Sequence, residues 1–207
     1  EEKIEYLPQY AEGIFEQIPT READGTFHFM FAGNIGPIQS VETVIRAAEI
    51  LKEEPMKFHI VGGGTDLERL KGIAKDLNNV VFYGRRPLEE MPKFYAMADA
   101  MLVTLAADPV LSLTLPGKVQ TYMAAGKPII GAINGETPLV VSEAECGICG
   151  VAEDAVALAE NLRSFALMDR EQLGNHARAY YDEHFDKLVF FKVLKRMLES
   201  EKERRCL

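Results

Sequence analysis

Residues 26–51 read TFHFMFAGNIGPIQSVETVIRAAEIL, and this stretch decides the fold. Residues 26–32 form an unbroken β-prone run that stops at Gly33, which is typical of a strand buried on both faces. Residues 38–51 then carry apolar side chains at the three- and four-residue spacing of one helix face. A buried strand, a glycine turn and an amphipathic helix together predict the first half of a βαβ unit.

The same alternation of strand and helix patterns continues along the chain. Further strands are expected at residues 57–61, 80–83, 100–105, 129–132 and 147–151. Helices are expected over residues 67–77, 88–98, 117–125 and 137–144, and the chain reads as helical from residue 153, with a break at Phe185 and Asp186. Thr65 and Glu68 have the spacing of a capping box for the second helix.

This pattern predicts a Rossmann-like α/β domain with a parallel sheet of about six strands flanked by helices. We expect residues 26–185 to form the domain, residues 1–25 to be a linker or N-terminal extension, and residues 186–207 to be a C-terminal helix. Ligands of such sheets bind beyond the carboxyl ends of the strands, so these ends are where candidate binding residues are sought.

Composition narrows the class of protein. The chain has 207 residues, 47% hydrophobic and 27% charged, with a net charge of -9. That balance is typical of one soluble domain and argues against a nonspecific nucleic-acid surface. No run approaches the roughly 20 apolar residues of a membrane span, and no signal-peptide pattern appears. Because the chain begins at Glu1 without Met, we expect a fragment or a processed product.

The cysteines and histidines favour packing over chemistry. Cys146 and Cys149 have C-x-x-C spacing, but they lie in a strand-like stretch without further zinc ligands, so we interpret them as small packed residues. Three cysteines and no signal peptide favour a reducing cytoplasm. The four histidines have no ligand-spaced partners. No Ser/His/Asp arrangement, carboxylate pair or metal site is predicted.

Glycine-rich turns follow the first two strands. Gly33, Asn34 and Gly36 precede Pro37, and Gly62 and Gly63 follow the second strand. Such turns allow a ligand to approach the backbone, and a helix that starts there presents free amides to an anion such as phosphate. Ordinary tight turns are the alternative.

Cationic turns follow the next two strands. Arg85 and Arg86 follow the third strand and could hold phosphate, or be solvated surface arginines. Pro116, Gly117 and Lys118 open a short helix, and we interpret them as a pocket for a diphosphate. Lys118 is not followed by Ser or Thr, so this is not a P-loop and no hydroxyl for Mg²⁺ is predicted.

Read in order, five segments resemble the C-terminal, donor-binding domain of retaining GT-B glycosyltransferases, the group 1 or family 4-like enzymes of polysaccharide biosynthesis. The segments span residues 29–130 and read FMFAGNIGPIQSVETVIRAAEIL, FHIVGGG, NVVFYGRRP, MPKFYAMADAMLV and LPGKVQTYMAAGKPII. The remainder to Phe191 matches more loosely.

The resemblance implies a donor site. Gly33, Asn34 and Gly36 would lie near the donor phosphates or sugar, and Arg85 would line the base pocket. Pro116, Gly117 and Lys118 would meet the diphosphate or the donor sugar, and Lys118 would act in catalysis by stabilising the leaving group. The remaining residues of the predicted donor-binding set are Gln39, Gly62, Gly63 and Thr121.

Some positions depart from the family pattern. Leu113 and Thr121 stand where many members carry a pair of Glu residues, the second of which holds the ribose hydroxyls. Asn34 and Gln39 stand where many members carry Arg and Lys at the first loop. These departures put ribose binding and donor affinity in doubt, and they admit a noncatalytic domain.

The resemblance also implies the partners. The donor would be a nucleoside-diphosphate sugar, used as a substrate, with no further cofactor. The N-terminal acceptor domain of the same protein would be missing, so this chain alone would be inactive. The full-length enzyme would work in the cytoplasm and could make a peripheral contact with the inner face of the membrane. Nucleic acid is not an expected partner. The alternatives are a noncatalytic nucleotide-binding or scaffold module and a fragment of a GT-B-fold sugar-nucleotide epimerase.

Overall fold

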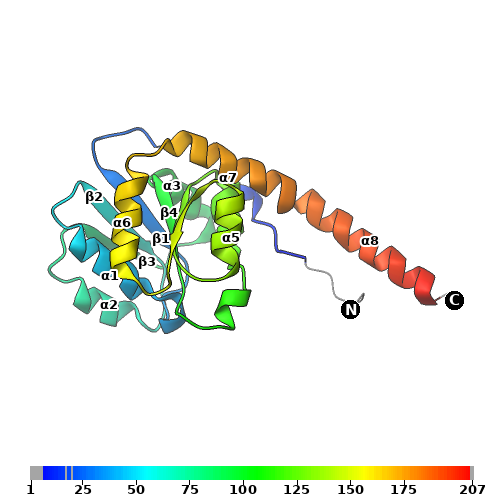
Figure 1. Ribbon diagram of the computed structural model, residues 1–207, viewed down its shortest axis with the longest axis horizontal. Coiled ribbons are helices and arrows are strands. Elements are labelled where there is room, and N and C mark those ends of the chain that lie inside the picture. The colour runs from blue at the N-terminus through cyan, green and yellow to red at the C-terminus, as the bar shows by residue number, and fades with distance from the viewer. Residues whose placement is uncertain (1–6, 17, 20, 206–207) are drawn as a thin grey trace.

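The computed structural model describes residues 7–205 apart from 17 and 20, and the side chains of residues 7–199 with the same exceptions. These residues include a six-stranded sheet of order β3-β2-β1-β4-β5-β6, in which every neighbouring pair is parallel (Figure 1). The strands are β1 (Phe27–Ala32), β2 (Met56–Val61), β3 (Val80–Gly84), β4 (Ala100–Thr104), β5 (Ile129–Ala132) and β6 (Gly147–Gly150). The predicted strands and the Rossmann-like α/β class are therefore confirmed.

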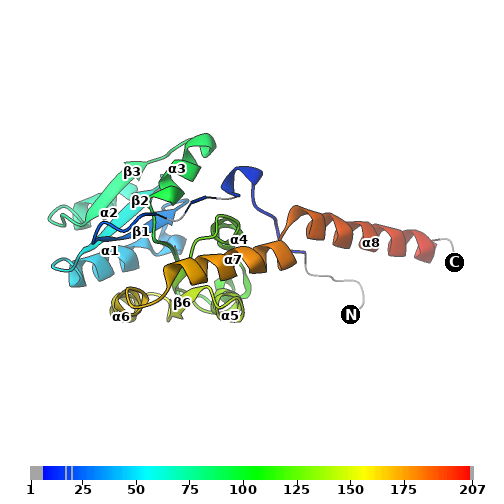
Figure 2. The ribbon, with the colours of Figure 1, turned by 90° about the horizontal axis from the view of Figure 1, so that it is seen from above.

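Helices cover both faces of this sheet. They are α1 (Val41–Ile50), α2 (Leu67–Ile73), α3 (Met91–Ala96), α4 (Gly117–Ala124), α5 (Glu136–Glu143), α6 (Ala155–Phe165), α7 (Arg170–His184) and α8 (Lys187–Arg205). Short 3-10 turns lie at η1 (Gly13–Phe15), η2 (Pro37–Gln39), η3 (Leu88–Glu90) and η4 (Leu111–Leu113). The break predicted at Phe185 and Asp186 separates α7 from α8, and α8 extends away from the body of the domain (Figure 2).

The alternation of side chains along β1 explains why its sequence is an uninterrupted apolar run. Phe29 and Phe31 are fully buried in the core that α1, α2 and α6 complete. Met30 and Ala32 point to the other face, where α3, α4 and α7 pack. Because both faces of a parallel sheet are covered, both sets of alternate residues must be apolar.

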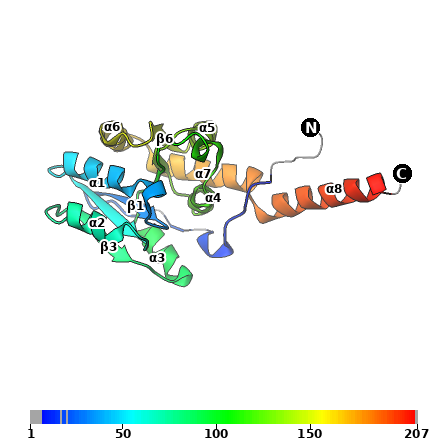
Figure 3. The same cartoon turned by 90° about the horizontal axis from the view of Figure 1, so that it is seen from below.

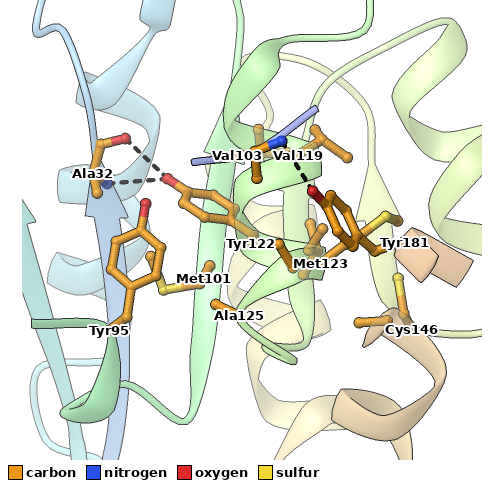
Figure 4. Packing of buried hydrophobic residues seen from close by; sticks show 14 of the residues in the cluster. Ala32, Tyr95, Met101, Val103, Val119, Tyr122, Met123, Ala125, Cys146 and Tyr181 are labelled. Carbon is orange, nitrogen blue, oxygen red and sulfur yellow. Dashed lines mark hydrogen bonds between the residues drawn. The ribbon is translucent and has the colours of Figure 1, made fainter. Parts of the chain in front are cut away.

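Two buried tyrosines lie in the core on the face of the sheet that α3, α4 and α7 cover, and they connect this core to other parts of the chain (Figure 4). The Tyr122 hydroxyl on α4 accepts a hydrogen bond from the Ala32 amide at 3.2 Å and donates one to the Ala32 carbonyl at 3.0 Å. The Tyr181 hydroxyl on α7 accepts from the Ala11 amide at 3.1 Å. Buried hydroxyls need such partners, and these two hold α4 to the end of β1 and the N-terminal segment to α7.

Part of the N-terminal extension belongs to this core. Ala11 is 8% exposed and Phe15 is 4% exposed, and both pack in the cluster that contains Tyr95 and Tyr122. The turn η1 that carries Phe15 contacts α3 and α4, and Figure 3 shows it beside the end of α3. The described part of residues 1–25 therefore lies on the domain rather than apart from it.

Two helix starts differ from the prediction. The capping box at Thr65 and Glu68 is wrong, because α2 begins at Leu67 after Asp66 and no side chain caps it. The start lies one residue later than a Thr65 cap requires, and Glu68 instead pairs with Lys71 at 2.8 Å. Residues 88–98 also form two pieces, η3 and α3, and Leu77 lies beyond the end of α2.

The cysteines behave as small packed residues. Cys146 is buried, Cys149 is half-buried, and both are free thiols. Burial raises the pKa of each thiol to about 12, which keeps them protonated and unreactive at neutral pH. The third cysteine, Cys206, lies outside the described residues. In the described part of the chain, no helix combines the length and apolarity that crossing a membrane would require.

Candidate functional site

A pocket of about 380 Å³ opens where β1, β2 and β3 end and α4 begins. Three strand-end turns and the first turns of α4, which are far apart in sequence, meet at it. The predicted site residues that line it are Gly33, Asn34, Gly62, Gly63, Arg85, Lys118 and Thr121. Parallel strands bring their carboxyl ends to one side of a sheet, which is the physical reason these residues converge.

Four other predicted residues lie near this pocket but do not line it: Gly36, Gln39, Pro116 and Gly117. The Gln39 side-chain oxygen accepts hydrogen bonds from the Asn34 side-chain amide and the Gly36 backbone amide, each at 3.2 Å, so Gln39 braces the first loop. A side chain on Gly117 would come within 3.7 Å of Gln9, in the N-terminal segment. Pro116 precedes it as the residue before α4. The structure therefore groups Gly36, Gln39, Pro116 and Gly117 around the pocket without placing them in its lining.

Glycine is required in the turns for two different reasons. Gly33 and Gly62 have φ angles of 146° and 147°, in the region that side chains resist, and a Cβ on Gly62 would lie 1.8 Å from the Gly33 carbonyl oxygen. Gly36 differs from expectation, because its φ of -127° is ordinary extended backbone. There a Cβ would only crowd Gln39 and Asn34, at 3.1 Å and 3.2 Å.

The turn after β1 also differs from the prediction, because no α-helix starts directly after Gly36. Pro37 begins η2, a single 3-10 turn, and α1 starts only at Val41. The amides of Gly33 and Ile35 are already bonded to the carbonyls of Val61 and Gly63, at 3.0 Å and 2.9 Å. The turn therefore offers fewer amides to an anion than a helix starting at Gly36 would have done.

Lys118 is the most unusual side chain of the pocket. Its ammonium nitrogen is buried and has no hydrogen-bond partner among the described residues. It lies 3.9 Å from the centre of the Phe31 ring and 3.2 Å from the position a Cβ on Gly33 would take. Burial lowers the pKa of Lys118 to about 7. Because no acidic side chain pairs with this ammonium, it is able to bind an anionic ligand that enters the pocket.

The two arginines after β3 are held differently. Arg86 donates to the Tyr83 carbonyl at 3.1 Å, lies 3.9 Å from the Glu90 carboxylate and stacks on the Phe94 ring at 5.7 Å. Arg85 has no hydrogen bond or ion pair within the described part of the chain, and it packs beside Gly63. Arg85 is therefore the more available of the two for a ligand.

Several residues of the pocket escaped the sequence analysis. Glu12 and Phe15 reach it from the N-terminal segment, and Met91 and Tyr95 reach it from α3. Nothing local marks these positions, although the apolar residues of α3 could have suggested a wall. Thr121, which was predicted, has its hydroxyl bonded to the Gly117 carbonyl at 3.1 Å.

Two histidines and a tyrosine, of which only His59 is buried, form a partly buried hydrogen-bonded row across three strands, away from the pocket lining. His28 Nδ1 lies 2.8 Å from His59 Nε2, and His59 Nδ1 lies 2.8 Å from the Tyr83 hydroxyl. Burial, and then the neighbouring His28, lower the pKa of His59 to about 4. The row is therefore neutral at physiological pH and serves packing, in line with the sequence interpretation.

Two curated relatives are similar to this chain over most of its length. The chain is 28% identical over 179 residues to the probable glycosyltransferase WbjE of Pseudomonas aeruginosa, covering 84% of this chain and 44% of that protein. It is 32% identical over 166 residues to the putative colanic acid biosynthesis glycosyl transferase WcaI of Escherichia coli K12, covering 76% of this chain and 39% of that protein. The chain thus spans less than half the length of these relatives.

Two solved structures have the same fold. Anabaena Alr3699/HepE, solved in complex with UDP and glucose, superposes with a TM-score of 0.68 at 21% identity, covering 85% of this chain and 49% of that one. The C-terminal domain of the group 1 family protein LpcC from Francisella tularensis superposes with a TM-score of 0.69 at 16% identity, covering 84% of this chain and 97% of that one.

The family description "Glycosyl transferases group 1" matches residues 26–166, which contain all six strands, the glycine turns and Lys118. The match therefore covers both the sheet and the pocket at its carboxyl end. This chain belongs to the group 1 family of glycosyl transferases.

Proposed function

We propose that this chain is the donor-binding domain of a glycosyltransferase that moves a sugar from a nucleoside-diphosphate sugar to an acceptor, with retention at the anomeric carbon, in polysaccharide biosynthesis. The observation that carries the proposal is the unpaired, buried Lys118 ammonium in a glycine-walled pocket. Family membership supports the reaction class, the WcaI likeness supports polysaccharide, and the UDP and glucose bound to the HepE neighbour support the ligand.

The diphosphate is expected to take the pocket's cationic side. When the bond between the sugar and the diphosphate breaks, negative charge grows on the leaving oxygen. The positive charge of the Lys118 ammonium would offset that charge electrostatically, and the positive end of the α4 helix dipole would add to it because Lys118 lies in the first turn of α4. Arg85, without an ion pair among the described residues, can meet the second phosphate or the base.

The acceptor site belongs to the part of the protein beyond this chain. The pocket opens at the carboxyl end of the sheet, so a second domain closing over it would exclude water and align an acceptor. We propose that transfer requires that domain and that this chain alone binds the donor without turning it over.

Isothermal calorimetry with a panel of UDP, GDP and dTDP and their sugars tests the proposal on this chain. Heat of binding is expected with at least one nucleotide, and Lys118→Ala is expected to weaken that binding by about tenfold or more, as loss of a hydrogen bond to a charged group does. Lys93→Ala, on the surface of α3, is the matched control and is expected to bind like wild type. If no nucleotide bound, the donor-site proposal would be refuted and a scaffold role favoured.

In the full-length enzyme, the Lys118→Ala variant is expected to lower turnover strongly, and NMR of the product is expected to show the anomeric configuration of the donor. Unchanged turnover would contradict the role of Lys118, and inversion would contradict retention.

A further inference from the structure

The N-terminal segment closes one side of the pocket with an acidic residue. Glu12, just before η1, lines the same cavity as Lys118 and Arg85, although it is more than 70 positions away in sequence from either. The segment carries no regular structure besides η1 in its described part, so its position depends on the contacts that it makes with the domain.

Those contacts anchor the backbone on both sides of Glu12. The preceding amide, of Ala11, donates to the Tyr181 hydroxyl at 3.1 Å (Figure 4). Three residues later, the Phe15 ring lies 4.9 Å from the Tyr95 ring and is almost completely buried. The Phe15 amide also donates to the Glu12 carbonyl at 3.1 Å. Glu12 is therefore presented to the pocket by a chain that is fixed before and after it.

The carboxylate is chemically out of place in an anion site. The other charged residues of the lining are the cations Arg85, Arg86 and Lys118. Glu12 forms no ion pair or side-chain hydrogen bond with any of the described residues, so it neutralises none of them. An ionised carboxylate can only accept hydrogen bonds, and its two oxygens suit two donors placed side by side. It would repel a phosphate and attract a pair of hydroxyl groups.

We infer that Glu12 is a ligand-binding residue that accepts hydrogen bonds from two adjacent hydroxyls of the donor. The inference rests on the proposed function and adds to it that the ligand carries a vicinal diol opposite its phosphates. Lys118 and Arg85 hold the anionic part, and Glu12 holds the neutral, hydroxyl-bearing part. Either the ribose of the nucleotide or the transferred sugar supplies this diol, since both carry the same chemistry.

Calorimetry with the nucleotide that binds wild type tests the role of Glu12. Glu12→Gln keeps the size of the side chain and removes its charge, and it is expected to weaken binding of the nucleoside diphosphate, of its nucleotide sugar, or of both by about tenfold or more. Glu16→Gln is the matched control: it lies in the same exposed segment, outside the pocket lining, with its charge beside Arg178 and Tyr181. Glu16→Gln is expected to bind like wild type.

The source of the diol is separated by a 2′,3′-dideoxy analogue of the same nucleotide. If ribose is the partner, the analogue binds wild type weakly and Glu12→Gln weakens it no further, as a closed double-mutant cycle requires. If the transferred sugar is the partner, Glu12→Gln weakens the nucleotide sugar and leaves the free nucleotide unchanged. Either result supports the inference.

Three outcomes would overturn the inference, and they are distinguishable. If wild type binds and Glu12→Gln has wild-type affinity for both nucleotide and nucleotide sugar, the inference falls and the proposed function stands. If wild type binds no member of the panel, the proposed function falls and the inference falls with it. Equal weakening by Glu16→Gln would show a general charge effect and would also overturn the inference.

Discussion

Two buried lysines lie at opposite ends of the same sheet, and they are held in opposite ways. Lys127, before β5, donates to the carbonyls of Pro19 and Ala98 at 3.0 Å and 3.1 Å. Lys118, at the carboxyl end, has no hydrogen-bond partner for its ammonium among the described residues, and the Phe31 ring lies against it. Burial lowers the pKa of both, to about 8 for Lys127 and to about 7 for Lys118.

The surroundings of the two lysines differ in the same sense. Near Lys127, the Asp99 carboxylate is fully buried and accepts from the His28 amide at 2.8 Å and from the guanidinium groups of Arg21 and Arg170. The Asp99 carboxylate and the Lys127 ammonium at the amino end of the sheet therefore both have hydrogen-bond partners within the protein. The buried charges of Lys127 and Asp99 are thus satisfied within the protein, whereas the Lys118 ammonium is left free to bind the donor, as the proposed function requires.

The largest expected change in stability comes from removing the hydrogen bonds that Asp99 accepts at the amino end of the sheet. Asp99→Ala leaves two partly buried guanidinium groups without their shared acceptor, and it is expected to lower the free energy of unfolding by about 3–5 kcal/mol. Urea denaturation measures the change. Asp76→Ala, whose exposed carboxylate lies 3.9 Å from Lys75, is the control and is expected to change stability by less than about 0.5 kcal/mol. Similar effects of the two substitutions would contradict the distinction between the ends.

The two lysines are expected to respond to the same substitution with opposite signs. Lys127→Met removes the donor to the buried Ala98 carbonyl and to the Pro19 carbonyl, and it should lower the free energy of unfolding by about 1–3 kcal/mol. Lys118→Met removes a buried amine that lacks a partner and should raise it by about 1–2 kcal/mol near neutral pH. The same denaturation experiment reports both changes. Destabilisation by Lys118→Met would show that its ammonium has a structural role.

The gain from Lys118→Met should depend on pH. The folded-state pKa of Lys118 is lowered from 10.5 to about 7, so the unfolded chain binds the extra proton between these values and its protonation favours unfolding. The penalty in wild type is therefore full below pH 7 and fades as pH rises towards 10.5. A pH-independent difference between the two proteins would contradict the lowered pKa.

The smallest expected effect is the uptake of a proton by the protein when the ligand binds. At pH 8.5 the free Lys118 amine is mostly neutral, and a diphosphate beside it raises its pKa, so binding should take up as much as about one proton. Calorimetry in two buffers of different ionisation enthalpy measures the uptake. Lys118→Met should abolish it, and Lys127→Met should preserve it because Lys127 lies at the other end of the sheet. Uptake that survives in Lys118→Met would place the titrating group elsewhere.

Sequence patterns predicted most of the fold because their causes are local. The apolar run of residues 26–32 favours a buried strand, and the glycines after the first two strands favour turns, whatever lies around them. Parallel strands then bring Gly33, Gly62, Arg85 and Lys118 to one end of the sheet, which the structure confirms as a shared pocket lining. The capping box at Thr65 failed because a helix start can move by one residue without altering the pattern.

The amino-acid sequence by itself thus determined the α/β class, the six strands and the end of the sheet at which the pocket lies. Only the tertiary structure decided that the Lys118 ammonium is buried without a partner, that Asp99 joins Arg21 to Arg170, and that Glu12 reaches the pocket. The physical reason is distance along the chain: the bond that anchors Glu12 joins Ala11 to Tyr181, 170 positions apart. Burial and pairing depend on neighbours that meet only in the folded state.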